Sequence, residues 1–236
     1  MENIAGNLER VQARIAAACA RAGRAPEGVR LVAVSKTHGP EAVGAAAAAG
    51  QRRFGENRVQ EAAAKIPGCP GRLEWHLVGH LQSNKAAAAA RLFDWVHSAD
   101  SAKVLEALDR QAGEAGRRLQ ALVQVNVSGE GAKSGLAPAA APAVLALAGR
   151  LRNVEIRGLM TIPPLAADPE QSRPHFRRLR ELRDAWARET GLDLPELSMG
   201  MSHDLEAAIE EGATFVRVGT DIFGARPRPA PAEEDT

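Results

Sequence analysis

Leu31-Val32-Ala33-Val34-Ser35-Lys36 is a run of β-favouring residues that ends in a lysine, and turn-forming residues follow it. If this run is the first strand of a parallel barrel, both of its faces are apolar, because helices cover one and the barrel interior the other. Lys36 then shares a face with Val32 and Val34, and burial there favours the neutral amine, a nucleophile toward carbonyl groups. The alternative is a lysine that ends a strand and extends its charge into water, and this run alone favours that alternative.

Outward from this run, β-favouring runs and helical segments alternate along the chain. A leading amphipathic helix is predicted over residues 3–24, because apolar residues recur there at helical spacing. Eight alternations of strand and helix predict a (β/α)8 TIM barrel with an extra N-terminal helix, and a doubly wound sheet is the alternative. The predicted strands are 31–36, 52–57, 74–81, 94–98, 119–127, 155–162, 196–201 and 214–220. The predicted helices between and after them are 40–50, 58–66, 84–92, 102–116, 139–151, 169–190, 204–211 and a short turn or helix that reaches 224.

Length and composition limit the class of protein. The 236 residues fit one α/β barrel or two small domains, and we expect one domain over residues 1–224 with a disordered proline-rich tail over 225–236. The net charge of +1 excludes a global field that would favour nucleic acid or a membrane surface. Cys19 and Cys69 lie far apart without metal-ligand spacing, and the chain shows no apolar signal or membrane-spanning run. We therefore expect a cytoplasmic protein.

Candidate site residues follow from the barrel, whose strands bring their carboxyl ends to one mouth. Those ends carry Lys36, Asn57, His80, Ser98, Met160, Ser202 and the run 217–220. The loops after the last two strands often bind phosphate, and Ser202 is predicted to cap the next helix, while Gly219 and Thr220 offer backbone amides. A simple cap at Ser202 and a tight turn at Gly219 are the alternatives. The joint placement of Ser202, Gly219 and Thr220 after the last two strands favours the phosphate site.

Arg217 faces opposite to Val216 and Val218 within a strand that should be buried. A buried guanidinium needs an acceptor, which is either a carboxylate or a heteroaromatic nitrogen of a cofactor.

Other polar residues give weaker signals. His76 and His80 alternate on one strand, but no cysteine or acidic cluster accompanies them, so we expect core or supporting roles. We expect His38, His97 and His203 to line the mouth without chemistry. The glycine-rich segment 129–135 lacks the P-loop pattern and is predicted to be a flexible surface loop, with Lys133 solvated.

Seven motifs span nearly the whole chain: VAVSK (32–36), FGENRVQE (54–61), WHLVGHLQSNK (75–85), GLMT (158–161), LSMGMS (197–202), VRVGT (216–220) and IFG (222–224). Through these motifs the sequence resembles the pyridoxal phosphate homeostasis proteins, the YggS/PROSC family. The resemblance implies a fold like the barrel domain of alanine racemase and pyridoxal 5'-phosphate (PLP) held as a Schiff base on Lys36. It also implies phosphate contacts near Ser202, Gly219 and Thr220, with Arg217 facing the pyridine nitrogen, and we add Asn57 and Met160 to the predicted cofactor-binding set.

An arginine partner should leave the pyridine nitrogen unprotonated, which weakens the ring as an electron sink. The chain has no tyrosine to act as a second catalytic base, and we expect the predicted tail to be too short to form a second domain over the site. We therefore expect a non-catalytic, monomeric protein that holds PLP and hands it transiently to apo-enzymes, without nucleic-acid or membrane partners. The alternatives are a weak PLP-dependent amino-acid racemase that uses Lys36 with water or a histidine, and a Schiff-base aldolase with Glu56 as its acid/base group.

Overall fold

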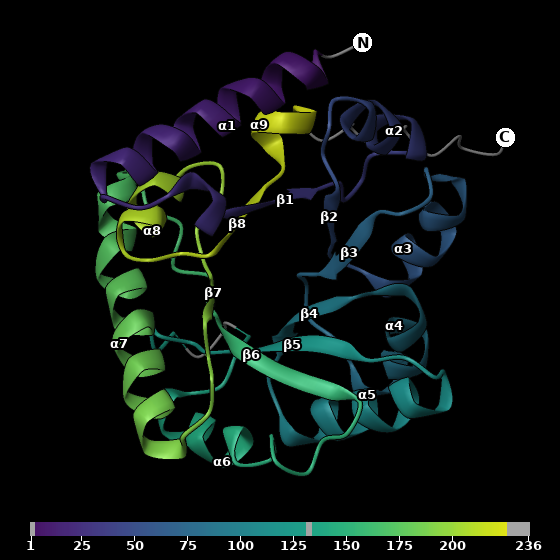
Figure 1. Ribbon diagram of the computed structural model, residues 1–236, viewed down its shortest axis with the longest axis vertical. Coiled ribbons are helices and arrows are strands. Elements are labelled where there is room, and N and C mark those ends of the chain that lie inside the picture. The colour runs from purple at the N-terminus through teal and green to yellow at the C-terminus, as the bar shows by residue number, and fades with distance from the viewer. Residues whose placement is uncertain (1–2, 131–133, 226–236) are drawn as a thin grey trace, which may run out of the picture.

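Eight parallel strands close into one barrel in the computed structural model, which describes residues 3–130 and 134–225 (Figure 1). Each strand pairs with its neighbours in chain order, and the pairing of β1 with β8 closes the ring. The predicted (β/α)8 barrel is confirmed. The strands are β1 Arg30–Val34, β2 Arg53–Glu56, β3 Glu74–Leu77, β4 Trp95–Ala99, β5 Leu119–Gln124, β6 Val154–Met160, β7 Glu196–Ser198 and β8 Phe215–Val218.

Helices surround the barrel, as the βα alternation predicts. Single-turn 3-10 helices connect several of them, at Pro26–Gly28, Ile66–Gly68, Ser83–Lys85, Pro138–Ala140 and Pro169–Ser172. The helix predicted over 139–151 is reduced to one short segment. The α-helices are α1 Ile4–Arg21, α2 Pro40–Ala48, α3 Val59–Lys65, α4 Ala86–Leu92, α5 Ala102–Glu114, α6 Ala141–Leu145, α7 Arg173–Thr190, α8 Leu205–Glu210 and α9 Thr220–Phe223.

Alternation along the strands divides the buried residues into two sets. One set packs between the barrel and the helices and includes Val216 and Val218. The other set fills the barrel interior and consists of Val32, Trp95, Leu122, Met160 and Phe215. Side chains on the inward face of a strand therefore lie in or beside this interior cluster, or at one of the two ends of the barrel.

The extra N-terminal helix, α1, lies against α8 and α9 (Figure 1). Arg14 on α1 donates hydrogen bonds to both carboxylate oxygens of Glu206, to Asp221 and to the carbonyl oxygen of Ser202. The hydrogen bond with Glu206 raises the pKa of Arg14. This one side chain ties α1 to the loops that follow β7 and β8.

Two predicted segments lie largely outside the described residues. Residues 131–133, with Lys133, interrupt the glycine-rich loop, and residues 226–236 make up nearly all of the predicted tail. Within the described ranges, no helix has the length and apolar character needed to cross a bilayer, and no cluster of His, Cys, Asp or Glu is suited to hold a metal ion. Cys19 and Cys69 are free thiols.

Candidate functional site

A cavity of about 660 Å³ opens among the loops at the carboxyl ends of the strands. This volume lies within the range typical of small-molecule sites. Six of the seven residues predicted to bind the cofactor line it: Lys36, Asn57, Ser202, Arg217, Gly219 and Thr220. Met160 does not, because its side chain is fully buried in the interior cluster below the cavity.

Lys36 lies two residues beyond the end of β1 and is half-buried in the cavity wall. Strand pairing continues to Ser35, whose backbone N–H donates to the Gly55 carbonyl oxygen at 2.9 Å. Thr37 then adopts a left-handed backbone conformation with φ of 67°, which is uncommon for a threonine, and its N–H donates to Glu61. The backbone is therefore held on both sides of Lys36.

Behind Lys36, outside the barrel wall, lies a buried ion pair between Glu56 and Lys65. The Lys65 ammonium is 2.6 Å from Glu56 Oε1 and also donates to the Ser35 carbonyl oxygen at 2.8 Å. The Ser35 hydroxyl donates to the same Glu56 oxygen at 2.6 Å. Burial raises the pKa of Glu56, while these hydrogen bonds oppose the shift. Glu56 does not line the cavity, so its predicted availability as an acid/base group at the mouth is wrong.

Arg217 forms the floor of the cavity and is 4% exposed. Its Nη1 donates to Ser198 Oγ at 2.5 Å and its Nη2 to the Thr161 carbonyl oxygen at 3.0 Å. Burial lowers its pKa to about 10, so the guanidinium stays protonated at neutral pH. No carboxylate in the described part of the chain forms an ion pair with Arg217. The alternative prediction, a carboxylate acceptor for this guanidinium, is therefore not met among these residues.

The loops after β7 and β8, where an anion site is predicted, carry backbone amides without hydrogen-bond partners among the residues that the structure describes. Among residues 3–130 and 134–225, no hydrogen bond uses the backbone N–H of Ser202, His203, Gly219 or Thr220. At Gly219 a Cβ would lie 3.0 Å from the Val34 carbonyl oxygen, so glycine lets this loop approach β1 closely. An amine, a guanidinium and unpaired amides on one cavity fit an aldehyde that carries a phosphate and a ring nitrogen.

The predicted cap at Ser202 is wrong. Helix α8 begins only at Leu205, with Asp204 as its N-cap residue, and the Asp204 carboxylate instead accepts from the Met201 N–H at 2.8 Å. Ser202 therefore sits in the loop itself.

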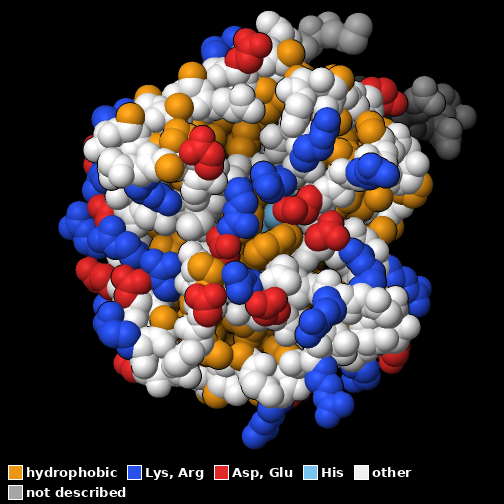
Figure 2. All heavy atoms as spheres, in the orientation of Figure 1, with side chains coloured by type: hydrophobic (Ala, Val, Ile, Leu, Met, Phe, Trp, Pro, Cys, Tyr) orange, Lys and Arg blue, Asp and Glu red, His pale blue; other side chains and the backbone are white. Residues whose placement is uncertain are grey.

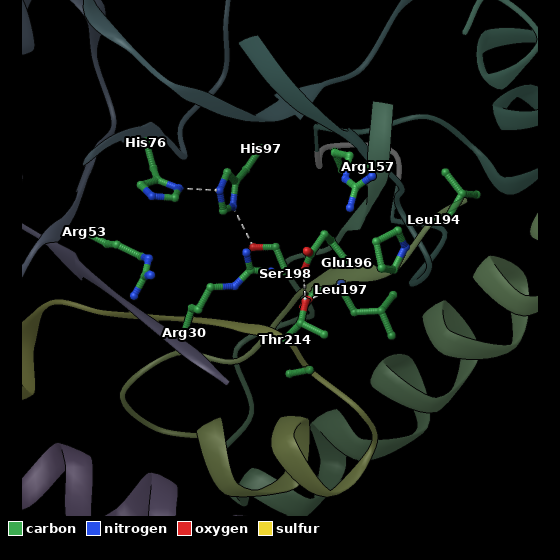
Figure 3. Close-up of polar contacts among 12 residues, drawn as sticks. Arg30, Arg53, His76, His97, Arg157, Leu194, Glu196, Leu197, Ser198 and Thr214 are labelled. Carbon is green, nitrogen blue, oxygen red and sulfur yellow. Dashed lines mark hydrogen bonds and ion pairs between the residues drawn. The ribbon is translucent and has the colours of Figure 1, made fainter. Parts of the chain in front are cut away.

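The histidines for which a role was predicted lie either at the mouth of the barrel or in its interior. His38 and His203 line the cavity as predicted, and exposed His80 contacts Asp100 at 3.0 Å. His97 does not reach the mouth: it is fully buried inside the barrel and contacts His76 (Figure 3).

Sequence reasoning also missed Gln124, which lines the cavity and donates to the Ser134 carbonyl oxygen at 3.1 Å. Its alternation with Leu122, an interior residue, is the signal that could have found it.

Comparison with known proteins places these features in context. The family model of the alanine racemase N-terminal domain matches residues 6–227. The chain is 48% identical to a pyridoxal phosphate homeostasis protein of Pseudomonas aeruginosa, over 98% of this chain and all of that one. It is 44% identical to the protein of that name from Escherichia coli K12, over 96% of this chain and 98% of that one.

Solved structures agree with the fold. PipY of Synechococcus elongatus, solved with PLP bound, is 43% identical and superposes with a TM-score of 0.83, covering 94% of this chain and all of that one. Alanine racemase of Clostridium difficile superposes with a TM-score of 0.75 at 13% identity, over 96% of this chain and 58% of that one, a likeness of fold alone.

Proposed function

This chain belongs to the family of pyridoxal phosphate homeostasis proteins, and from that premise we propose that it holds PLP as a Schiff base on Lys36 and supplies it to other enzymes. The observation that carries the proposal is the convergence of Lys36, Arg217 and the unpaired amides of two loops on one cavity. PLP bound there supplies a reactive aldehyde and an aromatic ring that can accept electrons.

Each part of the cavity has a distinct role in this proposal. Lys36 provides the nitrogen for the covalent bond, and Ser202, Gly219 and Thr220 surround the phosphate with backbone amides and hydroxyl groups. Arg217 donates toward the ring nitrogen. Met160 lies one layer below the cavity and supports its floor without contacting PLP.

A role in holding rather than transforming substrates follows from the same residues. Arg217 keeps its protons at neutral pH, so it supplies a donor to the ring nitrogen and leaves that nitrogen unprotonated. The chain contains no tyrosine. The rim of the cavity is open, with Leu165 at 92% and Ile162 at 40% exposure, and an open rim favours exchange of the bound molecule.

We expect the loaded protein to restore the activity of a PLP-dependent apo-enzyme mixed with it. The matched control is the same protein after borohydride reduction, which fixes the cofactor to Lys36 and should block transfer. Restoration by both samples would contradict release from Lys36.

The rival activity, amino-acid racemisation, has its own assay, because His38 and His203 line the cavity and a histidine is a competent second base. Prolonged incubation with L-alanine and separately with D-alanine should give no interconversion beyond that of free PLP. Sustained interconversion that Lys36→Ala abolishes would establish the racemase instead.

Replacement of Arg217 by glutamate should move a proton onto the ring nitrogen of bound PLP, since a carboxylate stabilises the protonated ring and a guanidinium does not. The measurement is the ¹⁵N chemical shift of ring-labelled PLP. Arg217→Lys, which keeps the charge but loses the planar donor geometry, is the control and should leave the nitrogen unprotonated. An unchanged shift in the folded Arg217→Glu variant would contradict contact between residue 217 and the nitrogen.

The remaining features of the proposal concern the setting of the protein. We propose that residues 1–224 form a single monomeric cofactor-binding domain, supported by the closure of β1 onto β8. Its partners are apo-enzymes met transiently. A cytoplasmic location is supported by the two free thiols, Cys19 and Cys69.

A further inference from the structure

A continuous row of hydrogen bonds runs through the barrel interior beneath Arg217. Ser198 Oγ, which accepts from Arg217 Nη1 at 2.5 Å, lies 2.8 Å from His97 Nδ1. His97 Nε2 lies 2.9 Å from His76 Nδ1, and His76 Nε2 lies 2.8 Å from Glu74 Oε1. Figure 3 shows the middle of this row, with His76 and His97 end to end and Ser198 beyond them. The row thus connects the floor of the cavity to the opposite end of the barrel.

With both imidazoles neutral, the Glu74 end sets one direction for every hydrogen bond in the row, and the Arg217 end is compatible with it. A guanidinium only donates, so Ser198 Oγ accepts from Arg217 and can give its own proton to His97 Nδ1. His97 then carries its proton on Nε2 and donates to His76 Nδ1. His76 in turn carries its proton on Nε2 and donates to Glu74, which as a carboxylate only accepts. In this arrangement both rings are neutral and both carry their proton on Nε2.

The surroundings favour this neutral arrangement. His76 and His97 are both fully buried, and burial lowers the pKa of each, that of His97 well below its ordinary value. The hydrogen bond from His76 lowers the pKa of Glu74 and keeps that acceptor ionised. Trp95 and Phe215 pack their rings against the two imidazoles and hold them in place.

The far end of the row lies in a charged layer at the amino ends of the strands. Glu74 also pairs with Arg53 at 3.3 Å, and Arg30, paired with Glu196, lies over the Phe215 ring at 3.8 Å. Side chains of both charge signs gather around the centre of the face shown in Figure 2, over the barrel. The Glu74 side chain is 38% exposed, so this end of the row lies at the surface.

We propose that Ser198, His97 and His76 are positioning residues that orient the Arg217 guanidinium through a one-directional hydrogen-bond chain anchored on Glu74. The inference rests on the proposed function, in which Arg217 donates toward the ring nitrogen of PLP. Its consequence is that the donor geometry at the cavity floor depends on residues that never touch the cofactor.

The first test needs no cofactor. In ¹⁵N-histidine-labelled protein without PLP at pH 7, two-bond ¹H–¹⁵N correlation spectra should show His76 and His97 as neutral Nε2–H tautomers, with the signals assigned in the unaltered protein through correlations of each ring with its own backbone. Charged His76, or the Nδ1–H tautomer of His97, would reverse the direction of the row and overturn the proposal. This result decides the proposal even where no variant folds, and even where PLP binds elsewhere.

The second test removes one link. Ser198→Ala should shift the ¹⁵N signal of His97 Nδ1, because that nitrogen loses its donor, and weaken PLP binding about tenfold, the effect of losing a hydrogen bond to a charged group. Ser198→Thr keeps the hydroxyl and should restore both. Ser172→Ala, at an equally buried serine on the outer side of the barrel, should change neither. An unchanged His97 Nδ1 signal and an unchanged affinity in Ser198→Ala, with PLP still bound through Lys36, would overturn the proposal while leaving the proposed function intact.

Discussion

Replacement of Lys36 by alanine is expected to abolish the visible Schiff base absorption of protein purified with PLP, because no other amine lines the cavity in the described part of the chain. Noncovalent binding through the phosphate loops and Arg217 should persist at lower affinity, since those donors are unchanged. Absorption spectra before and after borohydride reduction, with mass spectrometry of the peptide that contains residue 36, measure both effects.

Lys85 provides the matched control for this experiment. It lies beside the mouth, next to His80 and Asn57, but does not line the cavity. Lys85→Ala should retain the absorption and the labelled peptide. A Schiff base band that survives Lys36→Ala, or that disappears in Lys85→Ala, would contradict attachment at Lys36.

Replacement of Lys65 by alanine should lower the free energy of unfolding by about 3–5 kcal/mol, the usual cost of leaving one partner of a buried ion pair uncompensated. Glu56 is fully buried and its Oε2 already has no hydrogen-bond partner among the described residues. Without Lys65, the carboxylate retains only the Ser35 hydroxyl as a donor, and the Ser35 carbonyl oxygen loses its bond to the ammonium. Urea unfolding monitored by tryptophan fluorescence gives the free energy.

The double variant Lys65→Met with Glu56→Leu separates the ion pair from simple loss of side-chain volume. Replacing both charges with apolar groups of similar size is often neutral or stabilising, so the double variant should recover most of the lost stability. A double variant as unstable as Lys65→Ala would show that packing, rather than the unpaired charge, sets the cost.

The barrel could be predicted from the sequence because its signal is repeated eight times and needs only local patterns. The limits of the strands could not, since most end earlier than their apolar runs. At β7, the chain leaves the sheet after Ser198 and turns at Gly200, where φ is 90° and a Cβ would meet the Ala208 side chain at 2.5 Å. That close approach is tertiary, and it explains why the next helix starts at Leu205 and why Ser202 is free of a capping role.

The position of Lys36 in the site follows from alternation with Val32 and Val34, and the same reasoning placed Arg217 on the face opposite to Val216 and Val218. The acceptors of Arg217 could not be read in this way, because Ser198 and Thr161 lie 19 and 56 residues away along the chain. His97 shares its inward face with Trp95. Periodicity predicts which face a side chain lies on but not how far along the barrel axis it lies, so the interior position of His97 was missed. The burial of Lys65 could not be predicted from the helix pattern, because its ion-pair partner, Glu56, lies on β2.

Closure of the sheet has a consequence for how this chain meets other molecules. Every described strand is paired on both sides, so there is no free sheet edge at which a second polypeptide could be added by main-chain hydrogen bonding. Contacts with other proteins must therefore use loops and side chains. Over its described residues, the native barrel also has no unpaired strand that could start the edge-to-edge pairing from which many fibrils form.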